Sequence, residues 1–241
     1  MTVPSRTLAA LADPAANSFF VCGDFNQRIT RWGARTIDDL RWVFADIETR
    51  PIRITYRHSR QLNELARQIA LLSDPSIEEV QLPPATDSDE VKPVLGPNLR
   101  NAEDLAFWLR DRIVEIERMT QKLPSIAVLV NTEAEVGPVA EALDRVLRDQ
   151  NVRAVPCPGG KVVGQEMDVR VFDIQHIKGL EFEAVFLVAI DRLAERERDI
   201  FEKYLYVGAT RAATYLGLTL EGDRLPEKIH YLKASFDSSW S

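Results

Sequence analysis

The chain has 241 residues, of which 45% are hydrophobic and 28% are charged, and its formal net charge is −7. This size and composition indicate a globular protein with a buried core: one large domain, or one domain plus part of another. The acidic balance excludes a protein that coats polyanions through general positive charge, although a local nucleic-acid groove is compatible with it.

Simple counts exclude several further classes. No apolar run is long enough to span a membrane, and residues 1–10 lack a signal-peptide pattern. Two cysteines, Cys22 and Cys157, do not make a disulfide framework, which predicts a reducing, cytoplasmic compartment. No metal site is expected, because the three histidines are scattered and no Cys-x-x-Cys occurs.

The first third of the chain predicts two strands and two helices. The apolar run 18–22 is typical of a buried parallel strand, and 51–55 is the next strand candidate. Thr36 and Asp39 have the spacing of a capping pair, and Ser59 can cap a second helix. The expected inward faces are Leu40, Val43, Phe44 and Ile47 for the first helix, and Leu62, Leu65, Ala66, Ile69 and Ala70 for the second.

The middle of the chain begins with an irregular stretch. Residues 73–100 hold five prolines and are expected to lack clear regular structure. Asn101 with Asp104 then predicts the start of a long helix, and 125–130 is a buried strand. Thr132 with Glu135 forms the capping box of the next helix.

The last third alternates in the same way. Its strand candidates are 152–155, 169–173, 184–190 and 215–220, with a helix near 198–213 and a frayed tail at 236–241. Strands that alternate with helices predict an open parallel α/β sheet. Ligand sites are expected at the carboxyl ends of its strands.

A phosphate-binding loop of the form Gly-x-x-x-x-Gly-Lys-Ser/Thr is absent. Gly159-Gly160-Lys161 is followed by Val162, so we interpret it as a turn. The strand that ends near Asp191 has the form of a magnesium-binding Walker-B strand. That interpretation is disfavoured, because no phosphate loop precedes it.

Four clusters carry candidate chemistry. Gly23–Gln27 puts a carboxylate and an amide at the end of a strand. Tyr56-Arg57 could take a base and a phosphate at a helix N-terminus. Lys178–Phe182 lies in a turn between strands, and Arg211 lies on an apolar helical segment. Taken singly, the four are compatible with a strand-end turn, a capping loop, a tight turn and a surface ion pair.

The order and spacing of these clusters resemble motifs III to VI of UvrD/Rep-type superfamily 1 DNA helicases. Residues 23–34, Gly-Asp-Phe-Asn-Gln-Arg-Ile-Thr-Arg-Trp-Gly-Ala, resemble motif III, and Tyr56-Arg57-His-Ser59 resembles motif IV. Lys178-Gly-Leu-Glu-Phe182 resembles motif V, and Leu205-Tyr-Val-Gly-Ala-Thr-Arg211-Ala resembles motif VI. The resemblance spans about residues 18 to 220.

The resemblance implies an ATP site and assigns roles to its residues. Arg211 would be the arginine finger that stabilises transition-state charge, and Arg57 would contact the γ-phosphate. Tyr56 would stack near the adenine, and Glu181, in the turn with Gly179, would approach the ribose. Gln27 would sense the γ-phosphate and couple it to DNA.

The resemblance also implies contacts to single-stranded DNA. Trp32 would stack on a base with Arg31 beside it, although a half-buried surface aromatic is the alternative. Thr30 and His176 fall in the same DNA-facing set. Thr30 stands where the family usually has an aromatic residue. In motif V the family pattern Thr-x-His-x-x-Lys is altered: Asp173 and Gln175 occupy the threonine and histidine positions, and His176 is one residue out of register.

Motifs I, Ia and II, which bind the triphosphate and magnesium, are expected before motif III. We therefore predict that residues 1–50 are the tail of a first RecA-like domain and that 51–241 form the second. The function implied is the C-terminal half of an ATP-dependent DNA helicase or translocase, 3′ to 5′ by family, without ATPase activity alone. Its partners would be single-stranded or duplex DNA and an N-terminal motor domain in cis or trans, with ATP and Mg²⁺ as cofactors and no membrane.

Two other functions remain open. One is a degenerate, non-catalytic helicase-like module that binds DNA or a partner protein. The other is a small-molecule enzyme on a doubly wound sheet, for which the sequence offers no catalytic cluster.

Overall fold

The computed structural model describes residues 22–23, 25–27, 36–42, 48–50, 58–73, 91–177 and 179–240. The strands predicted at 51–55 and, apart from Cys22, at 18–22 lie outside these residues. So do five residues of the predicted site: Thr30, Arg31, Trp32, Tyr56 and Arg57. Within the described ranges, no helix has both the length and the apolar character needed to cross a bilayer.

A six-stranded parallel sheet organises the described part of the chain, with the order β1-β6-β5-β2-β4-β3. The strands are β1 (Val94–Gly96), β2 (Ile126–Val130), β3 (Ala154–Pro156), β4 (Val169–Asp173), β5 (Phe182–Leu187) and β6 (Ala212–Thr219). The central strands β2 and β4 are buried at every residue, as expected for a parallel sheet covered on both faces. The predicted open, RecA-like α/β sheet is confirmed.

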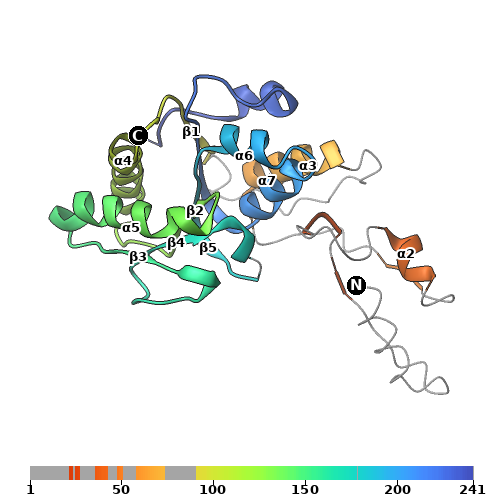
Figure 1. Ribbon diagram of the computed structural model, residues 1–241, viewed down its shortest axis with the longest axis horizontal. Coiled ribbons are helices and arrows are strands. Elements are labelled where there is room, and N and C mark those ends of the chain that lie inside the picture. Colours follow the sequence, from red (N-terminus) through yellow and green to blue (C-terminus); the bar gives the residue numbers. More distant parts are fainter. Residues whose placement is uncertain are drawn as a thin grey trace, which may run out of the picture.

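Helices cover the sheet on both sides (Figure 1). Helices α4 (Ala102–Thr120) and α5 (Glu133–Leu147) pack on one face, against strand side chains that include Val128 and Phe186. The other face carries α3 (Arg60–Ser73), α6 (Ile190–Arg196) and α7 (Phe201–Ala209). Successive strand residues point to opposite faces, so β2, β4, β5 and β6 each contribute to both cores.

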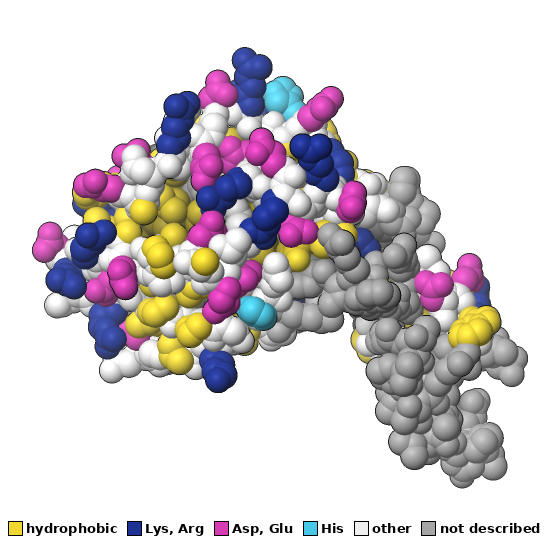
Figure 2. Space-filling model, viewed as in Figure 1, with side chains coloured by type: hydrophobic (Ala, Val, Ile, Leu, Met, Phe, Trp, Pro, Cys, Tyr) yellow, Lys and Arg dark blue, Asp and Glu magenta, His cyan; other side chains and the backbone are white. Residues whose placement is uncertain are grey.

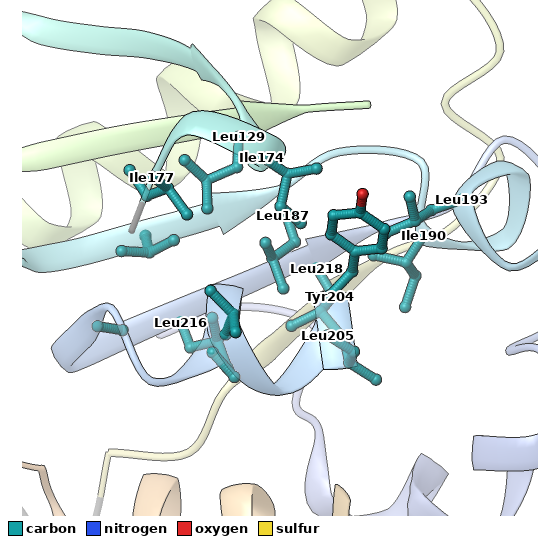
Figure 3. Packing of buried hydrophobic residues seen from close by; sticks show 14 of the residues in the cluster. Leu129, Ile174, Ile177, Leu187, Ile190, Leu193, Tyr204, Leu205, Leu216 and Leu218 are labelled. Atoms are coloured by element: carbon teal, nitrogen blue, oxygen red, sulfur yellow. The ribbon is translucent and has the colours of Figure 1, made fainter. Parts of the chain in front are cut away.

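Helix α7 covers the core on the face that carries α3 and α6. Tyr204 and Leu205 of that helix lie against strand residues, and α6 contributes Ile190 and Leu193 (Figure 3). Gly208 lets α7 approach closely, because a Cβ atom there would lie 2.4 Å from Cδ2 of Leu187. The helix that precedes Arg211 is therefore seated directly on β5.

The predicted helix starts are confirmed. Asn101 Oδ1 accepts the N–H groups of Glu103 and Asp104 at 3.0 and 2.8 Å, and the Ser59 hydroxyl accepts that of Leu62 at 3.3 Å. The five residues predicted to face inward on α3 are all buried. The short helix α2 (Ile37–Arg41) begins at the predicted capping box and buries none of its residues. Short 3₁₀ segments complete the described structure: η1 (Phe25–Gln27), η3 (Arg148–Gln150), η4 (Pro158–Gly160), η5 (Ile174–His176) and η6 (Glu227–Ser235).

Two predicted boundaries in the last third are wrong. The run 184–190 does not continue as a strand, because the chain turns at Ala189 (φ +48°) and Ile190 begins α6. Helix α7 ends at Ala209, so Arg211 lies in a turn and not on the helix. Ala212 already pairs with Phe182, and this sheet pairing outweighs the helical propensity of the alanines.

Two segments predicted to be irregular are ordered into the sheet. Residues 94–96 form β1, which pairs with the end of β6. The tail predicted to fray instead pairs with β1, through a bridge between Asp237 and Val94. Its Trp240 ring lies 5.3 Å from that of Tyr215 and 6.1 Å from that of Phe186. Burial of an aromatic ring stabilises a segment that has no hydrophobic periodicity of its own.

Candidate functional site

Arg211 is buried, with an exposed fraction of 3%. Its guanidinium donates from Nε to the Val207 carbonyl at 3.2 Å, from Nη1 to the Leu180 carbonyl at 3.3 Å and from Nη2 to the Thr210 hydroxyl at 3.4 Å. These acceptors are neutral oxygens. The side chain is thus oriented by the hydrogen bonds that it donates to two separate segments, residues 207–210 and Leu180.

The turn that carries Gly179 lies against Arg211. The Phe182 N–H donates to the Arg211 carbonyl at 2.9 Å, which joins the turn to the start of β6. Gly179 is exposed and has φ +87°, a left-handed conformation that favours glycine. Glu181 is also exposed. The predicted motif V and motif VI segments therefore meet.

The start of α3 contacts the residues on either side of Arg211. The Ser59 N–H donates to the Ala213 carbonyl at 3.1 Å, and His58 Nε2 lies 3.1 Å from the carbonyl oxygen of Thr210. Since a carbonyl only accepts, Nε2 carries the proton of this hydrogen bond. Asn63 Nδ2 donates to the His58 carbonyl at 2.9 Å and holds this residue from the other side.

His58 and Thr210 are residues of this site to which the sequence analysis gave no role. His58 lies next to Arg57 in the segment 56–59 that resembles motif IV, and this neighbourhood was the one indication in the sequence that His58 belongs to the site. Its contact with Thr210 spans 152 positions in sequence and could not be read from local pattern.

Gln27 lies in η1, is half-buried, and belongs to a segment that packs against α7. The end of predicted motif III is thus in contact with the helix that leads to Arg211. Residues 30–32, which are predicted to face DNA, lie outside the described ranges.

His176 lies apart from these contacts, among acidic groups. Its Nδ1 is 3.3 Å from Oε2 of Glu133, the first residue of α5. The neighbouring Asp173 is buried, and its Oδ1 accepts the Gln175 N–H at 2.9 Å. Burial raises the pKa of the Asp173 carboxyl, and the Gln175 hydrogen bond opposes part of that rise. A DNA contact by His176 stays a prediction, and these carboxylates would weaken its attraction for phosphate.

Asp191, the residue considered as a magnesium ligand, has a structural role. Its carboxylate accepts the N–H groups of Glu221 and Gly222 at 3.1 and 2.8 Å. It thereby fixes the loop after β6. On the face shown in Figure 2, Lys and Arg side chains lie interspersed with Asp and Glu. Nucleic-acid binding on that face would depend on individual residues more than on a broad basic surface.

Comparison with known proteins agrees with this geometry. Residues 168–219 match the family model of the UvrD-like helicase C-terminal domain, a range that contains both the Gly179 turn and Arg211. No curated protein matches the sequence. Among solved structures, the C-terminal domain of a possible DNA helicase from Lactobacillus plantarum WCFS1 superposes with a TM-score of 0.51 at 20% identity. The superposition covers 76% of this chain and 97% of that one. The resemblance to UvrD/Rep-type helicases is thereby confirmed: residues 168–219 match the C-terminal domain of UvrD-like helicases, within a RecA-like α/β fold.

Proposed function

We propose that this chain acts as the C-terminal motor half of an ATP-dependent DNA helicase or translocase, with Arg211 as its arginine finger. The observation that carries the proposal is the meeting of three separate segments at Arg211. The Gly179 turn reaches it through Leu180 and Phe182, and the start of α3 reaches it through hydrogen bonds to residues 210 and 213.

The hydrogen bonds of Arg211 hold its guanidinium in one orientation between the Gly179 turn and the end of α7. Carbonyl and hydroxyl oxygens orient the guanidinium. A γ-phosphate within reach of this guanidinium would form short, charge-assisted hydrogen bonds with it. The nucleotide would bind between this domain and an N-terminal motor domain, which would supply the phosphate loop and the Mg²⁺ ligands. ATP would bring the phosphoryl group, and this chain would stabilise charge as it develops.

The remaining nucleotide contacts follow from the same arrangement. The anchoring of His58 and Ser59 beside Arg211 supports a role for Tyr56 at the adenine and for Arg57 at the γ-phosphate. Exposure of Glu181 leaves its carboxylate accessible to the ribose. Packing of η1 against α7 supports Gln27 as the group that couples the nucleotide to DNA.

For the nucleic acid, we assign Trp32 as a stacking platform, with Arg31, Thr30 and His176 as further contacts. Base stacking on an aromatic ring contributes about 1–3 kcal/mol per base. We also assign the 3′ to 5′ direction of the family and a cytoplasmic location, in keeping with the two free cysteines.

The test uses this chain together with a UvrD-like N-terminal motor domain, fused or co-expressed. Arg211→Ala should lower DNA-stimulated ATP turnover by about 10³-fold or more. Arg211→Lys should also be strongly impaired, because an ammonium cannot reproduce bidentate contacts. Arg148→Ala is the matched control, because that arginine is 71% exposed and lies on η3. Circular dichroism and thermal melting would verify that the variants fold.

Turnover by Arg211→Ala within tenfold of the unmodified protein would contradict the arginine-finger assignment. If no ATPase activity appears with the N-terminal domain present, while the chain still binds single-stranded DNA or a protein, the non-catalytic module is the correct function. The altered motif V, with Asp173 and Gln175 at the threonine and histidine positions, is the feature that favours that outcome.

A further inference from the structure

We propose that Glu133, Asp173 and His176 form a binding site for a divalent transition-metal ion, of which Zn²⁺ is the representative. Each residue offers one ligand atom, and the three atoms lie within 4.8 Å of one another. One imidazole and two carboxylates are a donor set suited to zinc and similar ions. Three protein ligands leave a fourth position for water.

The sheet brings these residues together. Asp173 is the last residue of β4 and pairs with Val130 at the end of β2. Glu133 begins α5 three residues after β2, and His176 ends η5 three residues after β4. The cluster therefore lies at the carboxyl edge of two adjacent parallel strands, where open α/β sheets bind ligands.

Asp173 is the observation that points to a cation. It is 4% exposed, and its Oδ1 accepts the Gln175 N–H. Its second oxygen accepts no hydrogen bond and has no ion-pair partner among the described residues. The nearby Arg196 is engaged elsewhere, because its guanidinium donates to the Asn131 carbonyl and pairs with Glu197. A carboxylate so deeply buried normally has a paired cation or a metal.

The Gly159-Gly160 turn contacts the other two ligands. The Gly159 N–H donates to Oε1 of Glu133 at 2.8 Å, which leaves Oε2 facing His176. Gly160 has φ +73°, and a Cβ atom there would lie 2.8 Å from Cβ of His176. This close approach explains why glycine stands at that position. A hydrogen bond such as that from Gly159 to a ligating carboxylate is typical of metal sites.

The site contains none of the residues proposed to bind ATP and does not rest on them, although His176 is also one of the proposed DNA contacts. It would join the N-terminus of α5 to the segment that leads into the Gly179 turn. It also gives a role to the altered motif V: Asp173, where the helicase family has threonine, and His176, one residue out of register, are both ligands.

The experiment is titration of the purified full chain with Zn²⁺ by calorimetry. A Cys22→Ser background removes the exposed thiol, which could bind zinc by itself. We expect one saturable site per chain and a higher melting temperature with Zn²⁺ present. His176→Ala and Asp173→Asn should each weaken binding by at least about tenfold. Asp173→Asn keeps the shape and removes a buried charge, so this variant should remain folded.

His230→Ala is the matched control, because His230 is an exposed histidine on η6. It should bind Zn²⁺ like the unmodified chain. Mg²⁺, which prefers six oxygen ligands, should bind far more weakly. The proposal is overturned if Zn²⁺ shows no saturable binding, if His176→Ala binds it unchanged, or if Mg²⁺ competes on equal terms. None of these outcomes depends on ATPase activity, so failure here is separate from failure of the proposed function.

Discussion

Gly179 lies in the turn between Ile177 and Leu180, in which the Leu180 N–H donates to the Ile177 carbonyl at 3.1 Å. The φ of Gly179, +87°, lies in the left-handed region. The carbonyl of the next residue, Leu180, then accepts a hydrogen bond from Arg211. The conformation of Gly179 therefore helps to position the Leu180 carbonyl, which accepts a hydrogen bond from Arg211.

Gly179→Ala should destabilise the fold by about 1–2 kcal/mol, because a side chain in this conformation is strained even though no neighbouring atom crowds it. The measurement is chemical denaturation with the slope m compared between variants. The control is Gly137→Ala inside α5, where open space and ordinary helical geometry predict a gain of about 0.5–1 kcal/mol. Equal effects of the two substitutions would contradict the assigned backbone strain.

The long helix α4 is defined by its N-cap, its buried apolar stripe and its C-cap. Asn101 accepts two N–H groups of the first turn, and Leu105, Leu109, Ile113 and Ile116 form the buried stripe. Gln121, with φ +60°, ends the helix in a left-handed cap. The start of this helix at Asn101 was predicted from the sequence, whereas the conformation of Gln121 was not.

Asn101→Ala should reduce the free energy of unfolding by about 1 kcal/mol, because two N–H groups lose their acceptor. Asn101→Asp retains that acceptor and places a negative charge at the helix N-terminus, so it should be nearly neutral. Thermal melting monitored by far-UV circular dichroism distinguishes the two. A destabilised Asp variant would show that the amide nitrogen of Asn101, which donates to Asp104 at 2.7 Å, matters more than the cap.

At the scale of the whole molecule, the C-terminal tail closes the edge of the sheet. Trp240 Nε1 donates to the Lys92 carbonyl at 2.8 Å, and its backbone N–H donates to Oε2 of Glu115 at 3.1 Å. Arg112 Nη1 donates to the Ser238 carbonyl at 2.8 Å. The tail thus links α4, the approach to β1 and the sheet.

Trp240→Ala should destabilise the protein by about 2–3 kcal/mol, somewhat less than a fully buried aromatic would, because the ring is only half-buried. Trp240→Phe should recover part of the loss, since it keeps ring packing and loses one hydrogen bond. Urea denaturation of both variants tests this prediction. A change below about 0.5 kcal/mol for the alanine variant would mean that the tail is not part of the cooperative fold.

The chain by itself should show no DNA-stimulated ATP turnover, because the proposed site takes its phosphate loop and magnesium ligands from another domain. Release of inorganic phosphate, measured with and without single-stranded DNA, is the assay. Addition of a UvrD-like N-terminal motor domain should restore turnover. Activity of the isolated chain that survives Arg211→Ala would indicate a contaminating ATPase, whereas activity abolished by that change would refute the prediction.

Local chemistry was sufficient to predict most of the helices and strands in the described ranges. The resemblance located the segments around Gly179 and Arg211, which both lie within the matched residues 168–219. Caps and apolar stripes act over a few residues, so helix starts such as Ser59 and Asn101 could be read directly. Boundaries failed where sheet pairing decided them, at Ala212 and at residues 94–96. Contacts across the sheet were beyond reach, because hydrophobic periodicity does not encode strand order. The bond between His58 and Thr210, the inward orientation of Arg211 and the cluster around Asp173 all arise from the order in which parallel strands lie side by side. That order is decided by long-range pairing and burial in the folded chain.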